Sequence, residues 1–145
     1  MITSNTFCTI PFISLMVDST QKIQYCCIAK GPGALIHLEN GKIPYAGVDS
    51  LANAWNSPTM IDIRKKMVNG EKVDACSNCY YKESLGKPSN REYSIREWKW
   101  RLGEEQFNEL IQNTIDNDCV SPTAPIYLDL RLGNLCNLKC RMCNP

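Results

Sequence analysis

Nine cysteines stand among the 145 residues, and most of them fall into two groups whose spacing suits metal binding. The C-terminal group is a local trio with the spacing C-x3-C-x2-C, formed by Cys136, Cys140 and Cys143. Iron–sulfur clusters are normally held by four thiolates. A trio with no fourth ligand nearby leaves one iron open to a substrate or cofactor. The pattern therefore predicts a cluster that takes part in a reaction.

Zinc and simple packing are the alternatives for this trio. A zinc site with three cysteines needs a fourth ligand nearby, and the only histidine, His37, lies far upstream. On a helix the three thiols would form an apolar stripe. The residues around them instead favour a loop: Asn134, Asn137, Asn144 and Pro145. The spacing therefore favours iron and sulfide.

The second group lies in the N-terminal half of the chain and contains Cys8, Cys26, Cys27, Cys76 and Cys79. A C-x2-C pair with two distant cysteines suits either zinc or a second iron–sulfur cluster, and spacing alone does not choose between them.

Sequence features that indicate the cellular compartment favour metal binding over disulfide formation for these thiols. The N-terminus lacks the pattern of a secretory signal, and the apolar run from Ile10 to Val17 is shorter than the ~20 residues of a membrane helix. We therefore expect a cytoplasmic protein with reduced thiols, and the odd cysteine count fits poorly with complete pairing.

The formal net charge of +1 gives no field that would attract nucleic acid or an anionic membrane, so we expect neither as a partner.

A β-hairpin and a capped helix are expected to position the second group. Residues 12–17 and 23–28 are apolar and β-branched, and the polar segment 18–22 joins them. Ser57 and Pro58 then mark the start of a helix that Asn69-Gly70 ends. Near the C-terminal end of this helix, three cations are expected to complement its dipole and face water: Arg64, Lys65 and Lys66.

A second helical segment is expected from Ser89-Asn90, with a break near Gly103 and a continuation toward Ile115. Two Glu→Arg pairs at i,i+4 support it. Residues 117–125 are predicted to be a linker, and residues 126–132 a buried strand that leads into the cysteine trio. Cys119 is expected to be a free thiol in the linker, and His37 a surface residue without a role. For Glu83 and Arg91 the alternatives are a contact with the N-terminal cysteine site and a place at the surface, and we expect the surface.

The stretch Tyr127-Leu-Asp-Leu-Arg-Leu-Gly-Asn-Leu-Cys136-Asn-Leu-Lys-Cys140-Arg-Met-Cys143 resembles the signature of the radical S-adenosylmethionine (SAM) enzymes. The resemblance implies that the trio binds a [4Fe–4S] cluster whose fourth iron chelates SAM, and that reductive cleavage yields a 5′-deoxyadenosyl radical. Met142 then takes the place of the aromatic residue that packs near the adenine. The strand from Tyr127 would be the first of a partial (β/α)6 barrel.

The N-terminal half resembles the twitch/SPASM auxiliary-cluster domains of such enzymes. The motifs are Phe7-Cys8-x-x-Pro11-Phe12, Ala54-Trp55-Asn56-Ser57, Arg64-Lys-Lys-Met-x-Asn-Gly70 and Cys76-x-x-Cys79-Tyr-x-x-Glu83-x-x-Gly86. Where those domains usually carry a glycine, five positions before the cysteine, this chain has Gln21. The resemblance implies a second, auxiliary [4Fe–4S] cluster. Its ligands would be Cys8, Cys76, Cys79 and Cys26, with Cys27 as the alternative to Cys26.

Together these patterns predict an α+β chain in three parts. Residues 1–91 would form the twitch/SPASM-like domain, 92–125 a helical connector and linker, and 126–145 the start of an α/β radical SAM barrel. The resemblance implies an enzyme that modifies a peptide or protein and takes electrons from a donor of the flavodoxin or ferredoxin type. We expect the 145 residues alone not to cleave SAM, because a single barrel strand has no sheet to join. The alternative is a non-catalytic zinc-binding scaffold or interaction protein.

Overall fold

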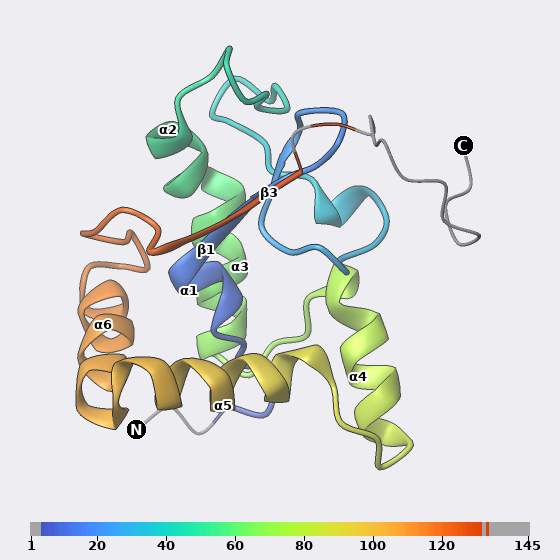
Figure 1. Ribbon diagram of the computed structural model, residues 1–145, viewed down its shortest axis with the longest axis vertical. Coiled ribbons are helices and arrows are strands. Elements are labelled where there is room, and N and C mark those ends of the chain that lie inside the picture. Colours follow the sequence, from blue (N-terminus) through green and yellow to red (C-terminus); the bar gives the residue numbers. More distant parts are fainter. Residues whose placement is uncertain (1–3, 132, 134–145) are drawn as a thin grey trace.

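A three-stranded sheet with the order β2-β1-β3 runs through the protein, and helices lie around it (Figure 1). The computed structural model describes residues 4–131 and residue 133. The four candidate residues of the C-terminal cluster-and-SAM site lie outside the described residues: Cys136, Cys140, Met142 and Cys143. The described part is a small α+β structure, as the sequence predicted. Within it, no helix is both long and apolar enough to cross a membrane.

The expected hairpin is present but shorter than predicted. Strand β1 (Ser14–Val17) pairs antiparallel with β2 (Ile23–Gln24). The preceding residues form the short helix α1 (Ile10–Ile13), because Pro11 favours its first turn. Residues 12–13 are therefore helical, and residues 25–28 leave the sheet for a loop, which corrects the predicted strand limits. All four residues of β1 are buried.

The hairpin turn holds Gln21 in a conformation that L-residues rarely adopt. The Asp18 carboxylate accepts hydrogen bonds from the backbone N–H groups of Thr20 and Lys22 at 2.8 and 3.0 Å. The chain between them closes with Gln21 at a φ of 68°. This left-handed region favours glycine because a Cβ atom crowds the backbone there. The glycine that the resemblance implies at this position would adopt this conformation without strain.

Strand β3 (Tyr127–Leu130) pairs in parallel with β1, with Ser14 opposite Tyr127. The expectation that this strand has no sheet to join is therefore wrong, since it extends the sheet of the hairpin. The expectation of a buried strand also differs from the structure. Three of its four residues are exposed, and in the described chain β3 is an edge strand with a neighbour on one side only.

Helices α2 (Leu51–Trp55) and α3 (Pro58–Val68) follow a loop that contains the 3₁₀ turn η1 (Pro32–Ala34). The start of α3 is confirmed, since the Ser57 hydroxyl accepts a hydrogen bond from the Met60 N–H. Its end is confirmed at Asn69, followed by Gly70 at a φ of 80°. Buried side chains on α3 pack against β1 and β2 in the main core: Met60, Ile63 and Met67.

Arg64 on α3 does not face water as predicted, because it is fully buried. Its guanidinium lies 4.3 Å from the centre of the Trp55 ring. It donates four hydrogen bonds of 2.7–3.0 Å to Asn56 Oδ1 and to the carbonyl oxygens of Pro11, Trp55 and Cys119. These bonds satisfy the buried charge, and burial still lowers the pKa of Arg64 to about 10. Only Lys65 and Lys66 reach solvent.

The 3₁₀ turn η2 (Asp74–Cys76) leads into α4 (Ser77–Ser84), and two longer helices follow, α5 (Asn90–Leu102) and α6 (Glu104–Asp116). The predicted start of α5 is confirmed by a capping box between Ser89 and Glu92. The break at Gly103 is also confirmed. Because Glu92 serves the cap, only the second predicted ion pair of α5 forms, between Glu97 and Arg101 at 2.7 Å.

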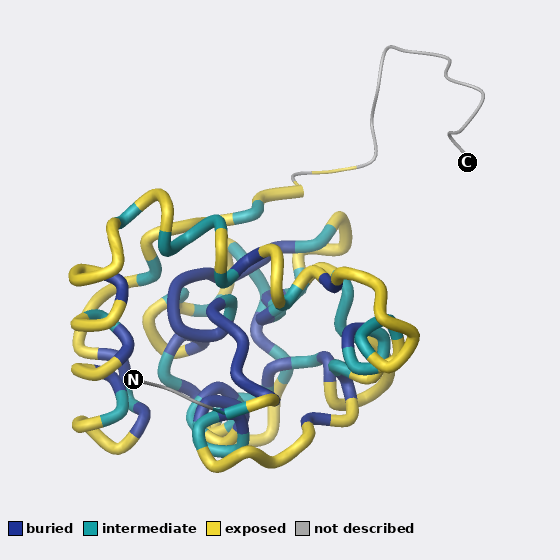
Figure 2. The backbone as a smooth tube through the Cα atoms, turned by 90° about the horizontal axis from the view of Figure 1, so that it is seen from below, coloured by how far each residue is buried: buried dark blue, intermediate teal, exposed yellow. Residues whose placement is uncertain are grey.

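The helical connector packs against the N-terminal segment. Figure 2 shows how the buried stretches of the chain gather toward the interior. A second core cluster joins residues before β1 to α6: Phe7, Phe12, Ile13, Phe107 and Ile111. The predicted linker, residues 117–125, is likewise held in place. Asn56 hydrogen-bonds the backbone of Ser121 in both directions, and Trp55 Nε1 donates to the Thr123 carbonyl at 2.7 Å. Cys119 in this segment is a free thiol but a buried one.

Candidate metal centre

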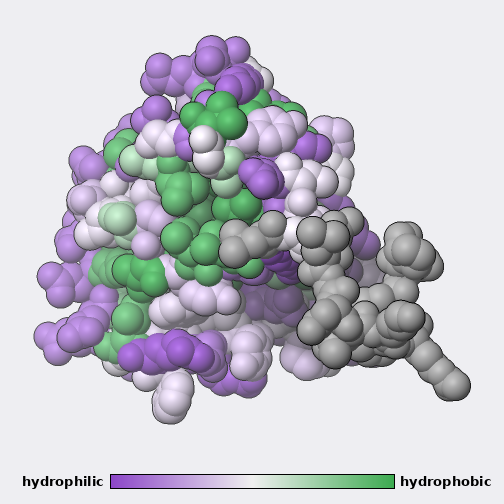
Figure 3. Space-filling model, turned by 45° about the horizontal axis from the view of Figure 1, so that its top comes forward, coloured by the Kyte–Doolittle hydropathy of each residue, from purple (hydrophilic) through white to green (hydrophobic). Residues whose placement is uncertain are grey.

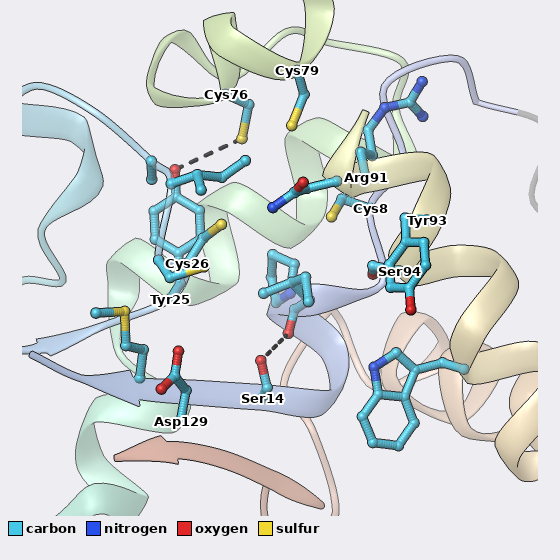
Figure 4. A pocket seen from close by; sticks show the side chains of 18 of the residues that line it. Cys8, Ser14, Tyr25, Cys26, Cys76, Cys79, Arg91, Tyr93, Ser94 and Asp129 are labelled. Atoms are coloured by element: carbon cyan, nitrogen blue, oxygen red, sulfur yellow. Dashed lines mark hydrogen bonds between the residues drawn. The ribbon is translucent and has the colours of Figure 1, made fainter. Parts of the chain in front are cut away.

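A cavity of about 470 Å³ lies between the end of the hairpin, α4 and α5, and the five cysteines of the N-terminal group line it. Figure 4 shows four of these thiols turned toward the same space: Cys8, Cys26, Cys76 and Cys79. They come from three segments that are far apart in the sequence. The grouping that spacing and resemblance predicted is thus brought together around one cavity.

Each segment is held by local structure that the sequence explains. Cys8 lies just before α1, where the Phe12 N–H bonds the Thr9 carbonyl at 2.9 Å. Cys26 follows β2 after one intervening residue, Tyr25. Cys76 closes the turn η2 through a 2.8 Å bond from its N–H to the Val73 carbonyl, and Cys79 lies in the first turn of α4. Two thiols three residues apart at a helix start can face one site.

Burial dominates the electrostatics of three of the thiols, those of Cys8, Cys26 and Cys76. It raises the pKa of Cys8 well above its ordinary value, and the charges of Cys26, Cys76 and Cys79 act in the same direction. Burial also raises the pKa of Cys26 to about 11 and the pKa of Cys76. Without metal these three thiols would therefore stay protonated at neutral pH. A cationic metal centre would offset this penalty by ligating the thiolates and releasing their protons.

The thiols line a cavity that is larger than the site of a single ion. Four thiolates at about 2.3 Å from one zinc ion must lie close together in a tetrahedron. Among residues 4–131 and 133, no group of three or more His, Cys, Asp or Glu side chains converges closely enough to hold one ion. The thiols instead surround a wider cavity. Soft thiolate ligands around such a space match the chemistry of an iron–sulfur cluster.

The two neighbouring cysteines after β2 differ in their surroundings. Cys26 is partly buried and packs against the main core, whereas Cys27 is exposed. The charges that act on Cys8 include that of Cys26. Burial and electrostatic proximity thus favour Cys26 over Cys27 as a ligand.

Arg91 and Glu83 belong to this site, although both were expected at the surface. Their side chains are only 12% and 18% exposed, and Arg91 Nη2 lies 2.7 Å from Glu83 Oε2. Arg91 lines the cavity and also donates to the Phe7 carbonyl at 2.8 Å. Burial raises the pKa of Glu83, but hydrogen bonds from Arg91 and Ser89 outweigh it and give a net lowering. The only sequence signal was the inclusion of Glu83 in the motif after Cys79.

Tyr25 is a further residue that sequence analysis missed. It precedes Cys26, it is buried, and its hydroxyl lies 3.8 Å from Cys76 Sγ. The opposite wall of the cavity is formed by α5 and the two parallel strands, through side chains that include Ser14, Tyr93, Trp98, Tyr127 and Asp129. The rings of Trp98 and Tyr127 lie 5.9 Å apart.

The other polar candidates lie away from this cavity. His37 is partly buried rather than fully exposed, and its backbone N–H bonds Thr59 Oγ1 at 3.0 Å. Cys119 lies beside Arg64 on the side of α3. The C-terminal trio and Met142 lie outside the described residues, so the cluster-and-SAM site stays a prediction.

Comparison with known families identifies the N-terminal half. Residues 8–80 match the family model named SPASM and described as an iron–sulfur cluster-binding domain. The match begins at Cys8 and ends just after Cys79, so it encloses all the cysteines that line the cavity. No curated protein and no solved structure matches the chain. The family match covers half of the 145 residues, and the chain therefore belongs to the SPASM family of iron–sulfur cluster-binding domains.

Proposed function

We propose that Cys8, Cys26, Cys76 and Cys79 hold one auxiliary [4Fe–4S] cluster. The observation that carries this proposal is the cavity itself, which thiols from three separate segments line in a chain of an iron–sulfur cluster-binding family. Four thiolates occupy all four irons. The cluster would then relay electrons or position a substrate, and it would not bind SAM.

The residues around the cavity give such a cluster a mainly apolar and electrostatically balanced setting. Cys8 and Cys79 are buried, and the wall from β1 contributes apolar atoms. Arg91 provides a positive charge at the rim, which Glu83 partly neutralises. Burial and nearby charge are among the factors that set the potential of an iron–sulfur cluster. The chain would thus hold the cluster in place, limit its contact with water and set the electrostatic field around it.

We further propose that the chain contributes to a radical SAM enzyme. SPASM domains are typical of such enzymes, and residues 127–143 resemble their signature. Cys136, Cys140 and Cys143 would hold a second [4Fe–4S] cluster with SAM on its open iron, and Met142 would lie by the adenine. Cleavage of SAM would supply the 5′-deoxyadenosyl radical. A peptide or protein substrate and an electron donor of the flavodoxin or ferredoxin type complete this proposal.

Anaerobic reconstitution with iron and sulfide, followed by metal analysis, tests the first proposal. A brown protein whose broad visible absorption bleaches with dithionite is expected, with roughly eight iron ions per chain when both clusters are present. A colourless protein that takes up zinc in place of iron would instead support the zinc scaffold.

The second proposal needs a polypeptide that also supplies the remaining barrel strands. Cys140→Ala should abolish the formation of 5′-deoxyadenosine from SAM there, because three thiolates are needed to hold the open-site cluster. Cys119→Ala, at a cysteine that belongs to neither group, is the matched control and should leave the rate unchanged. Normal turnover by Cys140→Ala would refute the radical SAM assignment.

A further inference from the structure

The sulfur of Cys76 has a hydrogen-bond partner of a different kind from those of Cys8 and Cys26. The sulfur of Cys8 accepts a hydrogen bond from the backbone N–H of Ile10. The sulfur of Cys26 accepts hydrogen bonds from backbone N–H groups in the loop after Cys27. Cys76 Sγ is instead paired with the phenol of Tyr25, 3.8 Å away, as the dashed line in Figure 4 shows. A side-chain partner can be removed by substitution, whereas a backbone partner cannot.

Burial of Tyr25 protects its hydrogen bond with Cys76. The Tyr25 side chain is 1% exposed, so water does not compete for its hydroxyl. Tyr25 lies in the loop after β2 and Cys76 ends η2, and the contact spans 51 residues of the chain. The bond thereby joins two of the three segments that line the cavity. A buried phenol that lost this partner would leave its hydroxyl unsatisfied.

Ligation determines the direction of the hydrogen bond. In the metal-free protein either the hydroxyl or the thiol can donate. A cysteine that binds iron does so as a thiolate, which has no proton. Tyr25 must then be the donor and Cys76 Sγ the acceptor. Hydrogen bonds to ligand sulfurs are one of the ways in which proteins set the potential of a cluster.

We propose that Tyr25 is a positioning residue that donates its hydroxyl proton to a hydrogen bond with the Cys76 thiolate and so raises the reduction potential of the auxiliary cluster. This inference rests on the proposed function of the cavity. Negative charge on the ligand sulfurs grows when a cluster gains an electron. A donor at one sulfur therefore stabilises the reduced form more than the oxidised form.

Tyr25→Phe tests this inference, because it removes only the hydroxyl. The measurement is an anaerobic redox titration in a Cys136→Ala, Cys140→Ala, Cys143→Ala background, where the auxiliary cluster alone titrates. Iron and sulfide content should match the parent. At the potential that half-reduces the parent, the reduced-to-oxidised ratio should fall about tenfold, a shift of about 59 mV for one electron.

Tyr93→Phe is the matched control. Tyr93 lines the same cavity, but it is 56% exposed and does not bond a sulfur atom within the described residues. Its loss should leave the potential unchanged. A purely structural role of Tyr25 would alter iron content or unfolding without moving the potential of the cluster that remains.

The outcomes separate the inference from the proposal beneath it. A parent that binds no iron and sulfide refutes the proposed function. A parent that binds them, with an unchanged potential in Tyr25→Phe, overturns the role of Tyr25 alone. If Tyr25→Phe loses iron, 3-fluorotyrosine at position 25 decides the question. Its more acidic hydroxyl should raise the potential, and an unchanged or lower value would contradict the inference.

Discussion

The guanidinium of Arg91 and the carbonyl oxygen of Phe7 are joined by a 2.8 Å hydrogen bond across 84 residues of the chain. Glu83 on α4 holds the same guanidinium through two further contacts of 2.7 and 2.9 Å. One cation therefore ties α4 and α5 to the residue that precedes Cys8. The bond places the Cys8 segment against the segment that carries Cys79.

Arg91→Lys should weaken the hold of the protein on its cluster. Lysine keeps the charge but lacks the planar fork that reaches two partners at once. We expect iron release to a chelator to become about tenfold faster, the loss of roughly one charge-assisted hydrogen bond. Arg96→Lys on the exposed side of α5 is the control. Equal rates of iron release in the two variants would show that Arg91 does not help to hold the cluster.

Glu83 should make the stability of the metal-free protein depend on acid pH. Its pKa is lowered on folding, since hydrogen bonds from Arg91 and Ser89 outweigh burial. The stabilisation is therefore present above the ordinary carboxyl pKa of about 4.3 and is lost as the pH falls below it. Urea unfolding at neutral and acid pH should show a smaller difference for Glu83→Gln than for the parent. A matching change in Glu97→Gln would mean that the effect is not specific to Glu83.

Arg64→Lys should destabilise the fold by about 3 kcal/mol, because a lysine leaves several buried carbonyl oxygens without a donor. The matched variant is Lys65→Met, one position along α3. Lys65 pairs with Asp118 in solvent, and its loss should barely move the midpoint of urea unfolding. Similar midpoints for the two variants would show that the buried hydrogen bonds of Arg64 are not decisive.

Gln21→Gly should stabilise the hairpin turn. Glycine adopts the left-handed backbone at a φ of 68° without strain. Its greater freedom in the unfolded chain offsets part of this effect, so we expect the free energy of unfolding to rise by about 0.5 kcal/mol. The same replacement at Gln24, on the extended backbone of β2, should instead cost about 1 kcal/mol. Urea unfolding measures both. A loss of stability in Gln21→Gly would contradict the account of the turn.

Helix boundaries were predictable because their signals are local. Ser57 and Ser89 each cap a helix with their own hydroxyl, which accepts a hydrogen bond from the backbone N–H three residues further along. Glycine or asparagine at the ends needs no tertiary knowledge either. The grouping of the N-terminal cysteines followed from motif resemblance, and the structure brings these residues to one cavity.

Features that depend on distant contacts were not predictable. A run of Arg64, Lys65 and Lys66 has the pattern of a solvated helix end, and nothing local distinguishes the buried member. The carbonyl oxygens that accept hydrogen bonds from Arg64 come together only when α1, α2 and residue 119 pack around α3. The parallel pairing of β3 with β1 has the same origin, because the two strands lie more than a hundred residues apart.

The most direct test of the auxiliary cluster uses the chain with Cys136, Cys140 and Cys143 replaced by alanine. After anaerobic reconstitution we expect roughly four iron and four sulfide ions per chain, and their loss when Cys76→Ala and Cys79→Ala are added. Replacing Cys27 alone should leave the content unchanged. Iron and sulfide that persist without Cys76 and Cys79, or a failure to bind them in their presence, would contradict the assignment.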